Sequence, residues 1–209
     1  MFDATFTRTG ETRVDAAIAE FPLLVHTWSR GRVSVDLRVA HVAGPVTRTV
    51  TVGGYVMPDL AEVRDLASTA GVYDEQTDGL MVLWPHPAPV YESHEHAAGH
   101  SLLISAEILP GQPFGAILRY TDELGGRPYA EIGVDPSGDR LGGHYPGEGI
   151  VHEWLHTFIA TAARSGGDRV DLDVPSSVAT TNRENSWGHW YDIVLQSVCD
   201  SLESRRENR

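Results

Sequence analysis

The feature that most constrains the fold of this chain is the segment His-Glu-Trp-Leu-His at residues 152–156, which has the pattern H-E-x-x-H. Apolar residues around it recur every three or four positions, which predicts a helix from about residue 148 to Gly166. An α-helix turns by about 100° per residue, so His152 and His156 share one face. Two imidazoles so placed can bind one metal ion, and the Glu153 carboxylate, offset by one position, can take a proton from a metal-activated water.

The composition excludes several other chemistries. All 16 basic residues are arginine, and the absence of lysine rules out a lysine Schiff base, a P-loop lysine and a Ser-Lys pair. With 29 acidic residues the net charge is −13, which argues against nucleic acid as a partner, because a phosphate backbone requires a basic surface. The single cysteine, Cys199, permits no internal disulfide and no cysteine-rich zinc site. Attack by a metal-activated water is the chemistry that these residues are best suited to perform.

The length of 209 residues favours one domain that spans residues 1–209. The first residues lack the basic and apolar regions of a secretory signal, and no run approaches the roughly 18 apolar residues of a membrane span. We therefore expect no membrane interaction and a cytoplasmic location by default, with export and oligomeric state left open.

The hydrophobic pattern predicts strands first and helices last, which is typical of the α+β fold class. Alternation over residues 31–52 indicates a β-hairpin, and the continuous apolar run 79–84 indicates an interior strand buried on both faces. A helix is expected at 59–70, where Asp59 and Glu62 have capping-box spacing. The remaining expected elements are strands at 101–109, 115–120 and 129–134 and a helix from about 189 to 205.

Around the motif the sequence resembles the zincin metallopeptidases, in particular bacterial proteins whose active helix has Gly-x-x-x-His-Glu-Trp-Leu-His after a Tyr-Pro-Gly entrance, here residues 145–156. The close match covers only residues 142–158. The resemblance implies a twisted mixed β-sheet, an active-site helix, an edge strand that can receive a peptide, and a C-terminal helix. It also implies a Zn²⁺-dependent metallopeptidase that acts on a peptide or protein substrate, with His152 and His156 as zinc ligands and Glu153 as general base.

A catalytic zinc ion needs a third protein ligand and an open position for water. Metzincins supply a histidine six residues beyond the second motif histidine, after a glycine. Ala162 occupies the histidine position here and Ile159 the glycine position, so the metzincin arrangement is absent. We therefore expect the third ligand from the segment 182–192, which opens the last helix.

Within that segment His189 is the favoured third ligand, because it begins the last helix beside two tryptophans. Glu184 is the main alternative, since it follows Asn-Arg in a sequence loosely like that of gluzincins; Asp192, His144 or an incomplete site stay open. Whichever of the first two does not bind metal can orient a ligand imidazole or, if His189, stabilise an oxyanion.

Two tyrosines near the motif, Tyr145 and Tyr191, are lesser candidates for the oxyanion role, and for each alone a place in the core is the simpler interpretation. The loop with His94, His96 and His100 makes a second metal site conceivable, although a solvated polar loop is the simpler explanation. Two other functions stay open: a non-catalytic zincin-like binding or regulatory module, and a zinc hydrolase that acts on non-peptide substrates.

Overall fold

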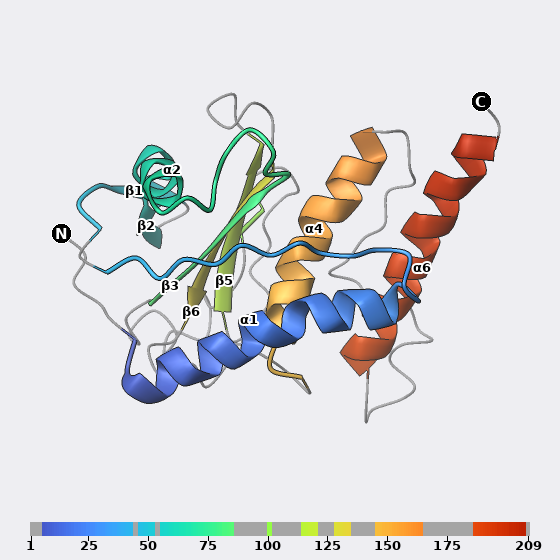
Figure 1. The fold of residues 1–209 in the computed structure, drawn as a ribbon, viewed down its shortest axis with the longest axis horizontal. Coiled ribbons are helices and arrows are strands. Elements are labelled where there is room, and N and C mark those ends of the chain that lie inside the picture. Colours follow the sequence, from blue (N-terminus) through green and yellow to red (C-terminus); the bar gives the residue numbers. More distant parts are fainter. Residues whose placement is uncertain are drawn as a thin grey trace. The chain divides into compact units, whose positions relative to one another are not determined.

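The computed structural model describes residues 6–43, 46–52, 55–85, 100–101, 114–120, 128–134, 145–164 and 186–207. Some side chains within the helices and strands, including those of residues 186–190, are outside this description. The chain divides into two compact units, which are described separately: Met1–Glu11 with Leu37–Asp139, and Thr12–Asp36 with Arg140–Arg209. Figure 1 labels their elements. The single domain expected over residues 1–209 stays a prediction.

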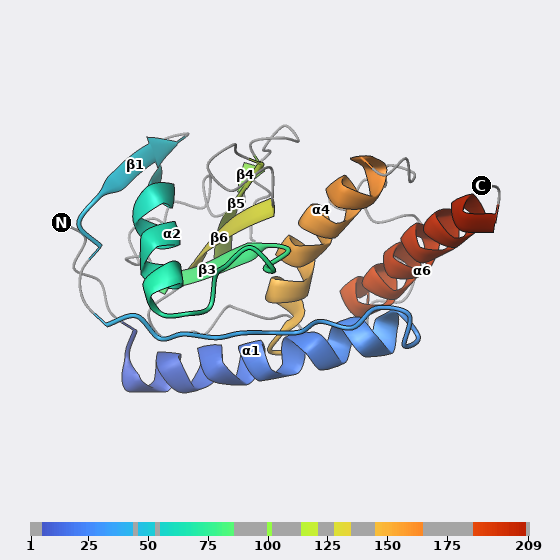
Figure 2. The ribbon, with the colours of Figure 1, turned by 45° about the horizontal axis from the view of Figure 1, so that its top comes forward.

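The first unit contains a four-stranded mixed sheet, whose strands Figure 2 shows beside the helix α2. Its order is β3-β6-β5-β4; β3 pairs parallel with β6, β5 pairs antiparallel with β6, and β4 pairs parallel with β5. The strands predicted at 115–120 and 129–134 are confirmed, whereas most of the strand predicted at 101–109 lies outside the described residues. The bounds are Leu80–Pro85 for β3, His100–Ser101 for β4, Phe114–Tyr120 for β5 and Pro128–Val134 for β6.

The strand predicted at 79–84 forms as β3. The prediction that it is an interior strand is wrong for the part of the sheet that the structure describes. β3 ends the strand order, and only Leu80 and Trp84 along it are buried. Leu80 packs with Leu60 and Val63 of α2 (Leu60–Thr69), and Val82 packs against the same cluster. The apolar run therefore reflects a strand covered by a helix, because hydrophobicity reports burial and not the number of neighbouring strands.

The hairpin predicted over residues 31–52 is also wrong, because residues 31–43 contain no strand. The observed antiparallel pair is β1 (Thr49–Val52) with β2 (Tyr55–Pro58), in which Val52 is opposite Tyr55. Two glycines stand between these strands in the sequence, and a two-residue Gly-Gly connection suits a tight hairpin. The side chains of Leu37 and Val39 are 40% and 46% exposed, so their alternation does not mark a buried face.

The helix predicted at 59–70 is confirmed as α2, and its ends have the expected signals. The Asp59 side chain accepts a hydrogen bond from the Glu62 amide at 3.1 Å, and Gly71 has a φ of +74° just beyond the last turn. The Glu62 carboxylate accepts hydrogen bonds from the Thr47 hydroxyl and from the Thr47 and Arg48 amides. Burial raises the pKa of Glu62, but these hydrogen bonds outweigh it, so the pKa lies below its ordinary value.

The described residues of the second unit form most of α1 (Arg8–Trp28), together with α4 (Glu148–Arg164) and α6 (Ser186–Glu207). The helix predicted from residue 148 is confirmed as α4, and the last helix begins three residues earlier than expected. In Figures 1 and 2, α4 and α6 run side by side in the same direction, and α1 crosses their N-terminal halves. The prediction that strands come first is wrong, because α1 precedes them.

One apolar stripe of α1 contributes to the core of this unit. Its buried residues recur every three or four positions, as an amphipathic helix requires. They are Val14, Ala17, Phe21, Leu24, Val25 and Trp28. Buried residues of the other two helices complete the core, and they include Val151 and Leu155 of α4 and Val194, Leu195 and Val198 of α6.

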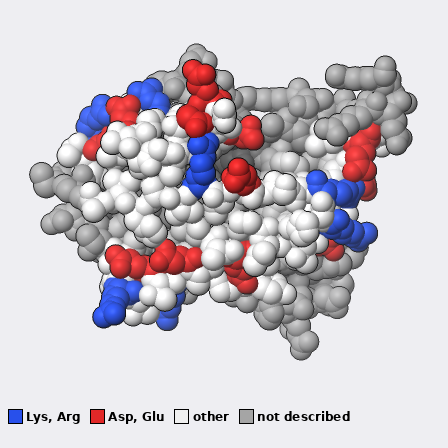
Figure 3. Space-filling view, viewed as in Figure 1, with Lys and Arg blue, Asp and Glu red and all other residues white. Residues whose placement is uncertain are grey.

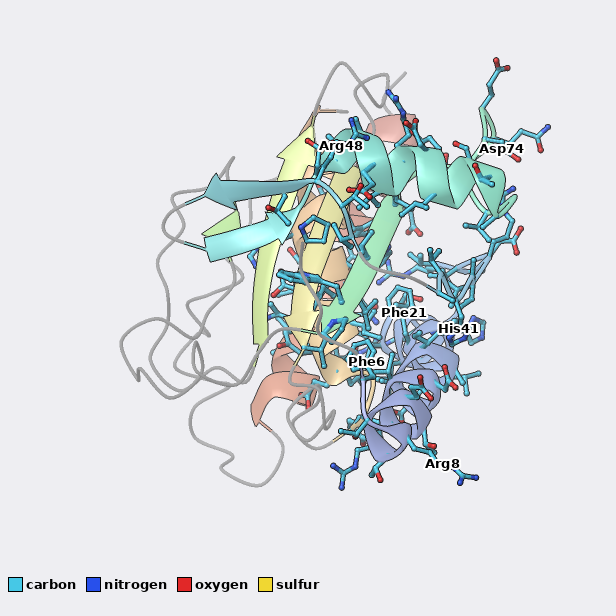
Figure 4. All side chains as sticks on the ribbon, turned by 90° about the vertical axis from the view of Figure 1, so that its left-hand side faces the viewer. Phe6, Arg8, Phe21, His41, Arg48 and Asp74 are labelled. Atoms are coloured by element: carbon cyan, nitrogen blue, oxygen red, sulfur yellow. The ribbon has the colours of Figure 1, made fainter. Side chains whose placement is uncertain are left out.

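Several charged residues in the described ranges form ion pairs. On the face in Figure 3, acidic and basic side chains lie in small groups separated by uncharged surface. Arg48 and Asp74 lie near opposite ends of α2 in Figure 4, and each has a partner of opposite charge. The hydrogen bond from the Arg38 guanidinium holds the pKa of Asp74 well below its usual range.

None of the helices in the described ranges combines the length and the apolar character that a membrane crossing requires.

Candidate metal centre

The first turn of α4 is fixed directly against α1. The Gly147 amide donates a hydrogen bond to Oε2 of Glu20 at 2.8 Å, which satisfies a donor that the helix itself leaves without a partner. A Cβ atom on Gly147 would lie 2.9 Å from the Ala17 carbonyl oxygen and 3.0 Å from the Phe21 amide nitrogen. Only glycine permits this approach, so the backbone of α1 sets the position at which α4 begins.

One turn further along α4, the two motif histidines face each other. His152 and His156 are 4% and 6% exposed, and their Nε2 atoms are 3.2 Å apart. Two facing nitrogen lone pairs repel each other unless a proton or a metal ion lies between them. Two nitrogen ligands of a tetrahedral zinc ion, each about 2.0–2.1 Å from the metal, would be roughly 3.3 Å apart. The spacing of the pair therefore fits a shared zinc ion.

The motif glutamate lies beside this pair. The Glu153 side chain is 3% exposed, and its Oε1 is 3.9 Å from Nε2 of His152. This separation is longer than a hydrogen bond, so the carboxylate is adjacent to His152 without being held by it. A proton acceptor therefore lies on the side of His152 that a metal ion would occupy.

The other ring nitrogen of His152 contacts α6. The hydroxyl of Tyr191, a buried residue, is 2.9 Å from Nδ1 of His152. When Nε2 is a metal ligand, Nδ1 carries the proton and donates to the tyrosine oxygen, which fixes the tautomer and the direction of the ring. Tyr191 is thus placed to orient His152. Tyr145 is half-buried and precedes α4, with its ring packed edge-on against Trp28.

The predicted third ligand is not determined by these contacts. Glu184 and His144 lie outside the described residues, and so does the side chain of His189, whose backbone belongs to the first turn of α6. Oδ1 of Asp192 accepts a hydrogen bond from Gln196 at 3.1 Å. Among the residues that the structure describes, no three histidine, cysteine, aspartate or glutamate side chains form a metal-binding group. The structure brings together His152, Glu153, His156 and Tyr191.

The residues proposed for a second site are also undetermined. His94 and His96 lie outside the described residues, and His100 begins β4 with its side chain outside the description. Cys199 is buried on α6, and burial raises the pKa of its thiol, as expected for a core residue.

Sequence reasoning missed the contribution of α1 to this centre. Glu20 and Trp28 contact the segments that carry the motif and Tyr191, yet neither belongs to a recognisable motif. The three- and four-residue spacing of the apolar stripe in α1 is the signal that could have revealed the helix. Pro22 interrupts that pattern, and an internal proline ordinarily argues against a helix.

Comparisons of the chain with protein-family models, with curated proteins and with solved structures gave no match.

Proposed function

We propose that this chain is a zinc-dependent hydrolase and, more specifically, a metallopeptidase. The observation that carries the proposal is the buried pair His152 and His156, whose facing Nε2 atoms have the spacing of two zinc ligands, with Glu153 beside them. Zinc bound there would supply a Lewis acid that lowers the pKa of a water molecule and polarises a carbonyl group.

Glu153 is the proposed general base. Its carboxylate accepts a proton from the attacking water while the water oxygen adds to the peptide carbonyl carbon. The same carboxyl group then delivers that proton to the leaving nitrogen as the carbon–nitrogen bond breaks, so the carboxylate is regenerated. Its burial keeps competing bulk water away from this proton. With Nε2 of His152 bound to the metal, the Tyr191 oxygen would accept a hydrogen bond from Nδ1–H and hold the direction of the ring.

His189 and Glu184 are the proposed candidates for the third ligand. Positions 189 and 191 are about 200° apart around the axis of a helix, so position 189 of α6 is not on the face that carries Tyr191. This geometry disfavours His189, and Glu184, which lies outside the described residues, is the alternative. Zinc affinities of His189→Gln and Glu184→Gln separate the two, because loss of a ligand weakens binding far more than loss of a neighbouring group.

The test of the proposed activity is cleavage of a diverse peptide library by the zinc-loaded chain. We expect cleavage that a chelator stops and that added zinc restores. The matched variant is Glu153→Gln, which keeps the size of the side chain and removes its basicity; it should retain zinc and lose cleavage by at least about 100-fold.

Zinc bound by both proteins without cleavage of any peptide would contradict the peptidase proposal. That result would favour a binding module or a hydrolase of non-peptide substrates, and a screen of esters and amides would distinguish these two.

A further inference from the structure

The C-terminal end of α1 carries a tryptophan that contacts both tyrosines near the histidine pair. Trp28 is buried, and its ring centroid is 5.6 Å from that of Tyr191 and 5.9 Å from that of Tyr145. The planes are inclined by 47° and 72°, within the tilted and edge-on arrangements that aromatic quadrupoles favour. Trp28 therefore restricts the positions of a ring on α6 and of a ring at the start of α4.

The main chain at Trp28 is itself attached to α6, beside which the end of α1 lies in Figures 1 and 2. The side-chain amide of Gln196 donates a hydrogen bond to the Trp28 carbonyl oxygen, and its own oxygen accepts one from Arg32. Arg32 also forms an ion pair with Asp200. These contacts hold the last turn of α1 to the helix that carries Tyr191, so Trp28 and Tyr191 keep a fixed relative position.

Tyr191 links this position to His152 through the 2.9 Å contact between its hydroxyl and Nδ1. Rotation of the imidazole about its Cβ–Cγ bond changes where Nε2 points, and a hydrogen bond at Nδ1 opposes that rotation. We propose that Trp28 is a positioning residue that holds the Tyr191 hydroxyl at Nδ1, so that Nε2 of His152 faces Nε2 of His156. The inference rests on the proposed metal site and adds a residue from a helix that the motif does not include.

The test measures affinity for Co²⁺, whose visible absorption reports the geometry of its ligands, in the wild-type protein and in matched variants. Trp28→Leu should weaken Co²⁺ binding about 10- to 100-fold, the range typical for loss of a group that orients a ligand, and should alter the absorption spectrum. Trp28→Phe, which keeps an aromatic ring, should recover most of the affinity.

The control is Phe21→Leu, which truncates another buried aromatic residue on the same face of α1. Phe21 contacts Trp154, with ring centroids 5.9 Å apart, and position 154 lies about 160° around the axis of α4 from each of the two histidines. Phe21→Leu should lower the melting temperature about as much as Trp28→Leu does. It should leave Co²⁺ affinity within about twofold of the wild-type value, since no contact among the described rings links Phe21 to Tyr191. Equal losses of affinity in Phe21→Leu and Trp28→Leu would overturn the inference and assign Trp28 a purely structural role.

A double-mutant cycle tests whether Trp28 acts through Tyr191. Tyr191→Phe removes only the hydroxyl, and Trp28→Leu should cost little further affinity in that background, because its effect requires the hydroxyl. Fully additive losses would overturn the inference.

Nitrogen-15 NMR of the His152 ring in metal-free protein provides a readout that does not depend on metal binding. Trp28→Leu should shift the Nδ1 and Nε2 resonances, and Phe21→Leu should not. A wild-type protein that binds no Co²⁺ or Zn²⁺ would refute the proposed function, and unchanged His152 resonances in Trp28→Leu would separately refute the positioning role.

Discussion

Replacement of Gly147 by alanine should destabilise the protein, although a glycine-to-alanine change near a helix start ordinarily stabilises it. The usual gain is about 0.4–1 kcal/mol, because alanine reduces the entropy of the unfolded chain. Here the new Cβ would lie 2.9 Å from the Ala17 carbonyl oxygen, 3.0 Å from the Phe21 amide nitrogen and 3.3 Å from the Phe21 Cα atom. All three atoms belong to the backbone of α1, so no side-chain rotation relieves the contact, and the two helices must separate.

The magnitude follows from the cost of overpacking, which is about 1–3 kcal/mol. After subtraction of the usual gain, the net loss in the free energy of unfolding should be roughly 0–2.6 kcal/mol, with a mid-range value of about 1.3 kcal/mol, or roughly 3–5 °C in melting temperature for a chain of this size. Urea denaturation followed by circular dichroism measures it. Gly71 provides the control, because its φ is +74° and nothing lies within 4 Å of its Cβ position. Asparagine tolerates a positive φ, so Gly71→Asn should lower the free energy of unfolding by less than Gly147→Asn does. A Gly147→Ala variant at least as stable as the wild type would refute the close approach of α1 and α4.

Three further predictions concern helix ends and pH. Arg30 has a φ of +54° beyond the end of α1, and the Gly31 amide donates a hydrogen bond to the His26 carbonyl, as in a Schellman motif. Arg30→Gly should therefore raise the free energy of unfolding by about 1 kcal/mol, and the melting temperature with it, because glycine adopts a positive φ without strain. An unchanged melting temperature would contradict this helix end. Asp59→Ala should cost about 1 kcal/mol in urea denaturation through loss of the cap on α2, and a change within error would show that the cap does not stabilise the helix. The lowered pKa of Glu62 means that its stabilisation is present above an unfolded-state value of 4.5 and is lost as the pH falls toward the lower folded value. Melting temperatures of Glu62→Gln should therefore fall less steeply than those of the wild type below pH 4.5; parallel curves would exclude this contribution.

The helices predicted correctly have signals contained within short stretches of sequence. For α2 these are the Asp59 cap, the apolar stripe and Gly71 at the end, and for α4 they are the apolar spacing and the two histidines one turn apart. Each signal acts between residues at most a few positions apart, so no knowledge of the tertiary fold is needed. The geometry of the histidine pair follows from helix periodicity alone.

The errors concern features that depend on residues distant in sequence. Alternation at Leu37 and Val39 suggested a strand, but a strand requires a partner, and β1 pairs instead with β2, its neighbour across two residues. The position of β3 at the end of the strand order depends on its pairing with β6, about fifty residues away.

The parts of the candidate site that sequence reasoning missed have the same origin. Glu20 lies 127 residues before the Gly147 amide that it binds, and Trp28 lies 163 residues before Tyr191. Neither spacing nor composition relates residues so far apart, so these contacts become visible only in the folded chain. Pro22 lies within the helix that carries both, where a proline ordinarily argues against a helix.

The most direct test of the central claim is the stoichiometry and affinity of zinc binding to the purified chain, measured by isothermal titration with His152→Ala as the matched variant. The account predicts about one zinc ion for each wild-type chain and a loss of at least about 100-fold in affinity in His152→Ala, because the Nε2 atoms of His152 and His156 are proposed to share the metal. A wild-type protein that binds no zinc, or that binds it as tightly after this substitution, would contradict the claim that the histidine pair is a metal site.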